Sequence, residues 1–196
     1  MVSQINLEQP HHTPEREGKT HPHKFAMWVA IASIVMMFAG LTSAYIVKSG
    51  QANWQDVKTP QVFWYSTAVL LISSITVQAA LRAIRQKAMQ QYRGLLLATL
   101  VLGLSFVILQ SIGFNWLWNH GVSFEGAGEG QFLYVIFGLH ALHVLGGVIA
   151  LTVMVAKQYF GKSRSYSTVP AEVMSTYWHF VDILWIYLLI FFIYIG

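Results

Sequence analysis

Two short stretches of the chain place ionisable side chains inside otherwise apolar sequence. The first is YWHFVDILW, residues 177–185, in which His179 and Asp182 lie about one helical turn apart. The second is FGLHALHVLGG, in which His140 and His143 are three residues apart. Imidazole and carboxylate groups can bind a metal, ligate haem, carry protons or hydrogen-bond a neighbouring helix. Because an unpaired buried charge costs several kcal/mol, these residues need partners, and their partners bear on function.

Spacing predicts which side chains of the two stretches act together. Within each stretch the polar and close-packing positions recur every three or four residues, which places them on one face of a helix. Such faces are expected to point into a helix bundle and away from lipid, and glycine there allows a neighbour to approach closely. The candidate site residues are His140, His143, Gly147, Trp178, His179, Asp182 and Trp185.

Composition indicates that these stretches belong to a membrane protein. Of the 196 residues, 55% are hydrophobic and only 10% are charged, and the mean hydropathy is +0.51. Soluble domains carry about 25% charged residues. The chain has no cysteine, which excludes disulfides, iron–sulfur clusters and thiolate-bound metals. The net charge of +4 comes from basic residues in short loops, so it indicates topology and not a nucleic-acid partner.

Charge-poor runs predict the elements that position the site. The fold class is all-α, a polytopic membrane bundle of five transmembrane helices in residues 24–196, because each run can cross about 30 Å of hydrocarbon and must be helical there. Residues 1–23 are predicted to be a flexible polar cytoplasmic tail, without the apolar core of a signal peptide. The predicted helices are residues 25–47, 61–81, 94–118, 131–156 and 175–195.

Basic residues predict the orientation of the bundle. If the N-terminus lies inside, ten Lys and Arg residues fall on the inner side and only two, Lys48 and Lys58, on the outer side. This distribution follows the positive-inside rule strongly. The sequence therefore predicts the N-terminus inside and the C-terminus outside, as an odd number of spans requires.

A metal site and a hydrogen-bonded polar network remain alternative interpretations of the ionisable residues. A metal or haem site would combine histidines of one helix with His179 or Asp182 of another. At about 1.5 Å per residue, His143 lies about 20 Å from the inner end and Asp182 about 10 Å from it, so one compact ligand shell would be strained. The network is favoured. We therefore predict no catalytic residue and no metal ligand in this chain, and a structural or lipid-binding role for the seven candidates.

Three motifs in order carry a family resemblance. YWHFVDILWIYLL, FGLHALHVLGG and MWVAIASIVMMFAGLTSAY together resemble subunit III of the haem-copper cytochrome c and quinol oxidases, in its short five-helix bacterial form. The resemblance covers about residues 24–196. It implies an accessory, non-catalytic subunit of a proton-pumping terminal oxidase that reduces oxygen to water. The chain has too few intramembrane histidines for subunit I and no cysteine pair for subunit II.

The resemblance also implies partners and a location. Subunit III of this family carries no redox centre. It packs on subunit I, with subunit II in the same complex, and holds phospholipid in a V-shaped cleft. It also supports proton uptake and sustained turnover, while haem and copper lie in the partner subunits. We therefore expect a bacterial inner (plasma) membrane protein with bound phospholipid. The electron donor, the haem type and membership of a larger respiratory supercomplex stay open.

Two positions depart from the family pattern. Ser33 is followed by Ile34, and Gly113 lies three residues after Gln110, where the family commonly has glutamate at both places. The resemblance therefore does not extend to proton transfer through those two carboxylates.

Two proteins of other classes remain as competing interpretations. A b-type cytochrome would use His140 or His143 with His179 as axial ligands, and an isolated chain of that kind would show a Soret band. A small proton-coupled transporter would use Asp182, but the sequence shows no internal repeat and no broken helix.

Overall fold

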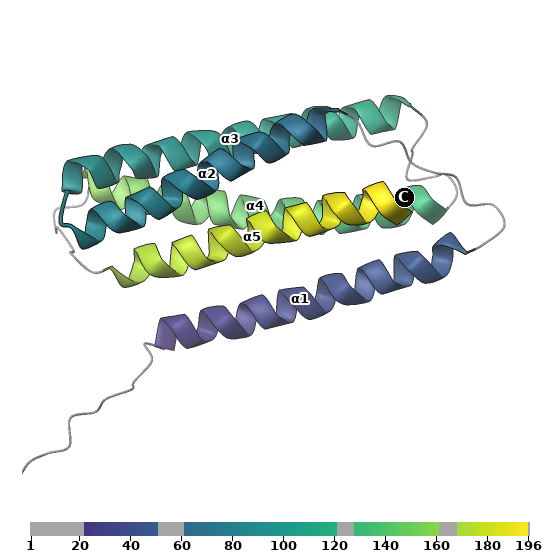
Figure 1. The fold of residues 1–196 in the computed structure, drawn as a ribbon, viewed down its shortest axis with the longest axis horizontal. Coiled ribbons are helices and arrows are strands. Elements are labelled where there is room, and N and C mark those ends of the chain that lie inside the picture. Colours follow the sequence, from purple (N-terminus) through teal and green to yellow (C-terminus); the bar gives the residue numbers. More distant parts are fainter. Residues whose placement is uncertain (1–21, 51–60, 121–127, 161–167, 196) are drawn as a thin grey trace, which may run out of the picture.

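The computed structural model describes residues 22–50, 61–120, 128–160 and 168–195, and within these ranges it contains five long helices and no strand. Each is long and apolar enough to cross a membrane. The all-α fold of five spans is therefore confirmed. Most of the predicted tail, together with Lys58, lies outside the described residues. The helices are α1 (Pro22–Ser49), α2 (Val62–Arg85), α3 (Met89–Asn119), α4 (Gly128–Phe160) and α5 (Val169–Ile195) (Figure 1).

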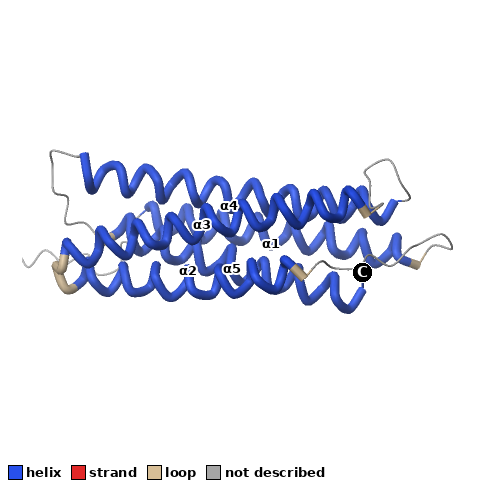
Figure 2. Tube along the Cα trace, turned by 90° about the horizontal axis from the view of Figure 1, so that it is seen from above, coloured by secondary structure: helices blue, strands red, loops and turns tan. Residues whose placement is uncertain are grey.

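The helices lie side by side with their long axes nearly parallel (Figures 1 and 2). Helices α2 and α3 have the most extensive contact with each other. Helix α5 packs on α2, and α4 packs on α3 and α5. Among the described residues, α1 contacts α4 and α5 but neither α2 nor α3. The bundle is thus a compact group of four helices with α1 attached along one side.

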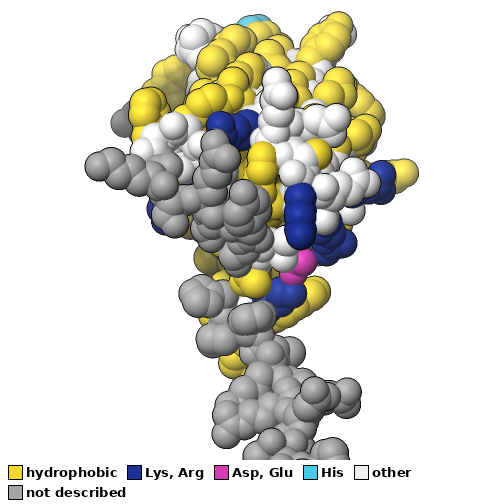
Figure 3. Space-filling view, turned by 90° about the vertical axis from the view of Figure 1, so that its left-hand side faces the viewer, with side chains coloured by type: hydrophobic (Ala, Val, Ile, Leu, Met, Phe, Trp, Pro, Cys, Tyr) yellow, Lys and Arg dark blue, Asp and Glu magenta, His cyan; other side chains and the backbone are white. Residues whose placement is uncertain are grey.

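Positive charge gathers at one end of the bundle, which we call the basic end. There α1 and α5 begin, α4 ends, and the chain turns from α2 into α3 (Figure 1). Figure 3 shows this end with its lysine and arginine side chains in dark blue. Its basic residues within the described ranges are Lys24, Arg82, Arg85, Lys87, Arg93 and Lys157.

The turn between α2 and α3 is short and fully hydrogen-bonded. The Ala88 amide donates to Ala83 O, and the Lys87 amide donates to Ile84 O, both at 3.0 Å. Lys87 adopts a φ of 59°, in the left-handed region that disfavours residues with a Cβ atom. This tight connection fixes α2 and α3 as an antiparallel hairpin.

An aromatic cluster forms the centre of the four-helix group. Trp185 of α5 is fully buried. Its ring centroid lies 5.5 Å from both Phe63 of α2 and Phe106 of α3, and 5.6 Å and 5.3 Å from Phe137 and His140 of α4. Edge-to-face and tilted contacts at these distances are favourable geometries for ring pairs. One indole therefore touches rings from all three of the other helices in the group.

Helix α1 is attached through a narrow stripe. Three residues spaced i, i+4 and i+7 on α1 are buried: Phe38, Thr42 and Tyr45. The Thr42 hydroxyl is 3.0 Å from the Tyr187 hydroxyl of α5, and the Tyr45 ring lies 5.1 Å from the ring of Phe192. The remaining faces of α1 are largely exposed. Gly40 lies on such a face, where an added Cβ would meet no atom within 4 Å.

Candidate functional site

A row of hydrogen bonds joins the polar residues of α5 to α2, and we call it the polar seam. Trp185 Nε1 donates to Thr67 Oγ1 at 3.0 Å, and Trp178 Nε1 donates to Ser73 Oγ at 3.0 Å. Further along, His179 bonds with two side chains of α2. The polar seam consists of Thr67, Ser73, Ser74 and Gln78 of α2 with Ser175, Trp178, His179, Asp182 and Trp185 of α5.

Both ring nitrogens of His179 are engaged. Nε2 lies 3.3 Å from Gln78 Oε1, an acceptor, so Nε2 carries the ring hydrogen and donates. Nδ1 then accepts from the Ser74 hydroxyl at 2.6 Å. The Ser175 hydroxyl donates to the same Gln78 oxygen at 3.3 Å. The imidazole is thereby fixed in orientation by α2, and both of its nitrogens are engaged in contacts between α5 and α2.

Asp182 is the most deeply placed acid of the described residues. Its side chain is 4% exposed, and Ser74 lies beside its carboxyl group. The Ser74 side chain therefore stands between His179 and Asp182, which are not bonded to each other directly. Asp182 Oδ2 has no hydrogen-bond partner within the described part of the chain.

The three candidates on α4 face different neighbours. His140 is 2% exposed, and its ring is enclosed by Trp185 and Phe106. His143 is half-buried, with its Nδ1 at 2.6 Å from Leu139 O and its ring edge-on to Phe38 of α1. The structure therefore separates the two histidines that spacing had placed on one face.

Gly147 provides close packing between α4 and α5. A Cβ at this position would lie 3.1 Å from atoms of the Tyr177 and Trp178 rings. Tyr177 in turn donates from its hydroxyl to His143 O at 2.8 Å. The neighbours that approach this glycine closely are aromatic rings of α5.

The ionisable candidates on α4 and α5 lie in separate surroundings. Among the described residues, no group of three His, Cys, Asp or Glu side chains is placed to hold a metal ion. His179 belongs to the polar seam, while His140 lies inside the aromatic cluster and His143 faces α1. The arrangement can join helices, but it offers no ligand shell.

Sequence reasoning missed the half of the polar seam that α2 supplies. The signal was present in the stretch STAVLLISSITVQ, where hydroxyl and amide residues recur at Thr67, Ser73, Ser74 and Gln78. In a transmembrane helix, such residues commonly bond to adjacent helices. Gln110 of α3 is bonded in the same way, since its Nε2 donates to Ser66 Oγ of α2 at 3.1 Å.

An apolar groove opens between α1, α4 and α5 near the basic end. Its volume is about 830 Å³, which falls in the range of pockets that bind organic ligands. No charged side chain lines it. The lining residues are Met27, Gly146, Ala150, Val153, Met154, Val169, Pro170, Val173, Met174 and Tyr177.

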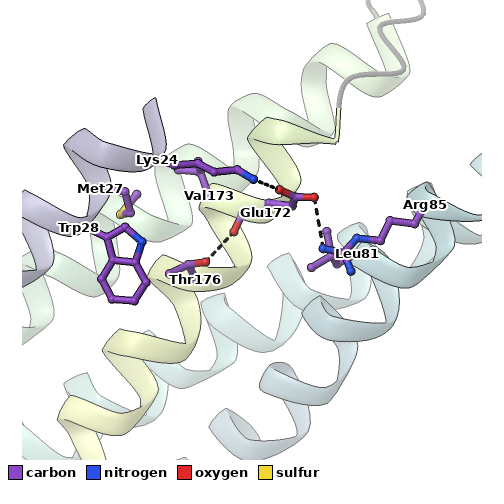
Figure 4. A pocket seen from close by; sticks show the side chains of 8 residues that line it. All are labelled: Lys24, Met27, Trp28, Leu81, Arg85, Glu172, Val173 and Thr176. Carbon is purple, nitrogen blue, oxygen red and sulfur yellow. Dashed lines mark hydrogen bonds and ion pairs between the residues drawn. The ribbon is translucent and has the colours of Figure 1, made fainter. Parts of the chain in front are cut away.

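A cluster of three charges borders this groove. Glu172 of α5 accepts from Lys24 of α1 at 2.5 Å and from Arg85 of α2 at 3.2 Å (Figure 4). The pocket around these charges shares Met27 and Val173 with the apolar groove. The cluster joins α1 to α2, which otherwise do not meet.

At the two positions where the family commonly has glutamate, this chain has residues that pack against neighbouring side chains. Ile34 is partly buried against the core. Gly113 lies against the Phe63 ring so closely that a Cβ would overlap it. A longer side chain at position 113 therefore requires Phe63 to move.

These features define a class of protein. The chain is a polytopic membrane protein in which, within the described residues, a row of intramembrane polar side chains joins two of its own helices. Comparison with known proteins then identifies the family. The family model described as cytochrome c oxidase subunit III matches residues 8–196. The chain belongs to this family.

Individual relatives are also named as cytochrome c oxidase subunit 3. A Mycobacterium tuberculosis protein named "Probable cytochrome c oxidase subunit 3" is 34% identical over 163 residues, which are 81% of this chain and 80% of the relative. A Nocardia farcinica protein of the same name is 35% identical over 161 residues, covering 80% and 79%. "Cytochrome c oxidase subunit 3" of Bacillus sp. strain PS3 is 29% identical over 188 residues, covering 89% and 87%.

Proposed function

We propose that this chain is the non-catalytic third subunit of a cytochrome c oxidase complex in a bacterial inner membrane. It stabilises subunit I, holds phospholipid and supports proton uptake while oxygen is reduced to water. Haem and copper are carried by subunits I and II. The observation that carries the proposal is the polar seam, because it engages the intramembrane histidine best placed for chemistry in contacts between helices.

The apolar groove supports a lipid-holding role. Its volume of about 830 Å³ and its aliphatic lining suit acyl chains. Lys24 and Arg85 lie at its border, and cations at a membrane surface attract anionic headgroups. This is a different location from the seven candidate residues, which lie deeper or on other faces. We therefore propose the groove as the lipid site and a structural role for the seven.

The proposed orientation places the basic end in the cytoplasm. Six Lys and Arg side chains lie there among the described residues, and positive residues favour the inner face of a membrane. Proton uptake by an oxidase occurs from that side. Because positions 34 and 113 carry Ile and Gly, this chain would act on proton uptake through its contact with subunit I, without passing protons itself.

The decisive experiment uses the purified oxidase complex. We expect Asp182→Ala to leave the haem content near that of the wild type, because no haem ligand is removed. The variant should weaken retention of this subunit in detergent or shorten the number of turnovers before inactivation. Subunit composition by mass spectrometry, the visible spectrum and oxygen consumption measure these three properties.

Specific results would contradict the proposal. Loss of the haem spectrum while the partner subunits stay assembled would assign a redox ligand to this chain. A Soret band in the isolated chain would do the same and would favour the b-type cytochrome. Purification without any haem-bearing subunit would remove the accessory role.

A further inference from the structure

A small cavity lies between the polar seam and the aromatic cluster, among α2, α3, α4 and α5. Its volume is about 10 Å³, and its polar wall is formed by Ser73, Trp178 and Asp182. Gly103 and Phe106 belong to the apolar wall. A cavity needs about 10–15 Å³ on this measure to contain one water molecule. The space therefore admits a single water molecule and no larger ligand.

The carboxyl group of Asp182 can accept more hydrogen bonds than the described residues provide. Its Oδ2 is buried and has no partner within them. The neighbouring Ser74 hydroxyl has one hydrogen and lies beside both the Asp182 carboxyl group and His179 Nδ1, so it can donate to at most one of them. A buried polar atom left without a partner destabilises the fold, and more so if it is charged. The side chain therefore favours occupation of the cavity by a donor.

Ser73 contributes a second polar group on the same wall. Its Oγ accepts from Trp178 Nε1 at 3.0 Å, and no bond in which its hydroxyl donates is seen among the described residues. In contrast, the Ser66 and Thr67 hydroxyls of the same helix both donate to Phe63 O. The Ser73 hydroxyl is thus available to donate into the cavity.

We propose that one water molecule binds in this cavity, accepting a hydrogen bond from the Ser73 hydroxyl and donating one to Asp182 Oδ2. The resulting chain of bonds runs from Trp178 through Ser73 and the water molecule to Asp182. It satisfies two polar groups that the helices cannot satisfy by themselves. Gly103 keeps the cavity open. A Cβ at this position would come within 2.8 Å of the Trp178 ring and would displace the ring.

The test is a cryo-EM map of the purified assembly that contains this chain, at a resolution at which other buried water molecules are visible. The expected result for the wild type is a single density peak within hydrogen-bond distance of both Ser73 Oγ and Asp182 Oδ2. A cavity without density would overturn the proposal. So would a direct bond from Asp182 Oδ2 to a side chain of another subunit.

Two variants and a control sharpen the test. Asp182→Leu and Ser73→Ala should each abolish the peak, because each removes one of the two polar contacts. Ser66→Ala should retain it, since Ser66 is an equally buried serine of α2 that bonds Gln110 and does not line the cavity. Persistence of the peak in both cavity variants would contradict the assignment. If neither variant assembles, the wild-type and Ser66→Ala maps decide the question.

Discussion

His179 illustrates how an ionisable side chain is accommodated in the middle of an apolar helix. Ser74 and Gln78 lie about one turn apart on α2 and engage its two ring nitrogens. One ring nitrogen therefore acts as a donor and the other as an acceptor, and each has a partner on α2. Such matching makes the polar seam a source of packing specificity for α2 against α5.

Ser74→Ala tests this role of the serine. The substitution leaves His179 Nδ1 without its donor, and interhelical side-chain bonds in membrane proteins contribute about 0.6 kcal/mol on average, with about 1.7 as a maximum. We expect a loss of stability in that range, measured as the midpoint of subunit dissociation in a detergent titration of the complex. Ser105→Ala is the control, because Ser105 bonds only its own helix at Val101 O. Equal effects of both changes would show that the interhelical bond contributes nothing.

Gly113→Ala tests the packing that replaces the family's glutamate. The added Cβ would overlap Phe63, and forced repacking of this kind costs about 1–3 kcal/mol. Gly138→Ala is the matched control, since a Cβ there meets no atom within 4 Å. The double variant Gly113→Ala/Phe63→Leu should recover most of the loss, measured by the same dissociation midpoint. A double variant that is additive would mean that the two positions do not interact.

The residues of the candidate site were only partly predictable. His179, Asp182 and Trp178 stand out because polar and aromatic residues interrupt an apolar run. Ser73 and Ser74 do not stand out, since serine in a transmembrane helix also bonds its own backbone. His140 and His143 are three residues apart, and a rotation of about 60° between them is enough to turn one into the core and the other toward α1. Spacing alone does not resolve that difference.

At the scale of elements, the α2–α3 hairpin depends on a short turn that contains a strained residue. Lys87 has a φ of 59°, which costs a residue with a Cβ about 1–2 kcal/mol. Glycine avoids that cost but loses about 0.5–1 kcal/mol of conformational freedom on folding. Helix propensity and charge patterns gave no sign of this conformation, because lysine is an ordinary residue near a helix end.

Lys87→Gly should therefore stabilise the chain by about 0.5–1 kcal/mol. The control is Lys87→Ala, which removes the same charge but keeps the Cβ and hence the strain. Thermal dissociation of the subunit from the complex compares the two. If alanine stabilises as much as glycine, the effect comes from the lost charge and not from the backbone.

The helices themselves were the most predictable part of the molecule. Runs without charge locate five spans because lipid excludes charged residues and requires internally bonded backbone. The contacts between the helices were not predictable in this way, since lipid-facing and helix-facing sides of a transmembrane helix are both largely apolar. That α1 meets α4 and α5, and not its sequence neighbour α2, depends on the side chains of Phe38, Thr42 and Tyr45.

At the scale of the whole molecule, the interior has two zones. Toward the basic end the polar seam joins α2 and α5, while the aromatic cluster around Trp185 joins α2, α3, α4 and α5. Apolar burial contributes little between helices in lipid, so the close fit of rings and hydrogen bonds carries the association. The outer faces of the described helices carry many exposed large hydrophobic side chains, as a lipid environment favours.

The side attachment of α1 has a consequence for biosynthesis. Ribosomes deliver α1 first, yet the surfaces that receive it belong to α4 and α5, and its partner Tyr187 follows Thr42 by 145 positions. During translation α1 enters the bilayer before the α2–α3 hairpin, and its contacts with α4 and α5 form after that hairpin has been made. Helix α1 can meet α4 first, but its bond from Thr42 to Tyr187 can form only after α5 has been made, so this attachment is a late step in the packing of the described helices.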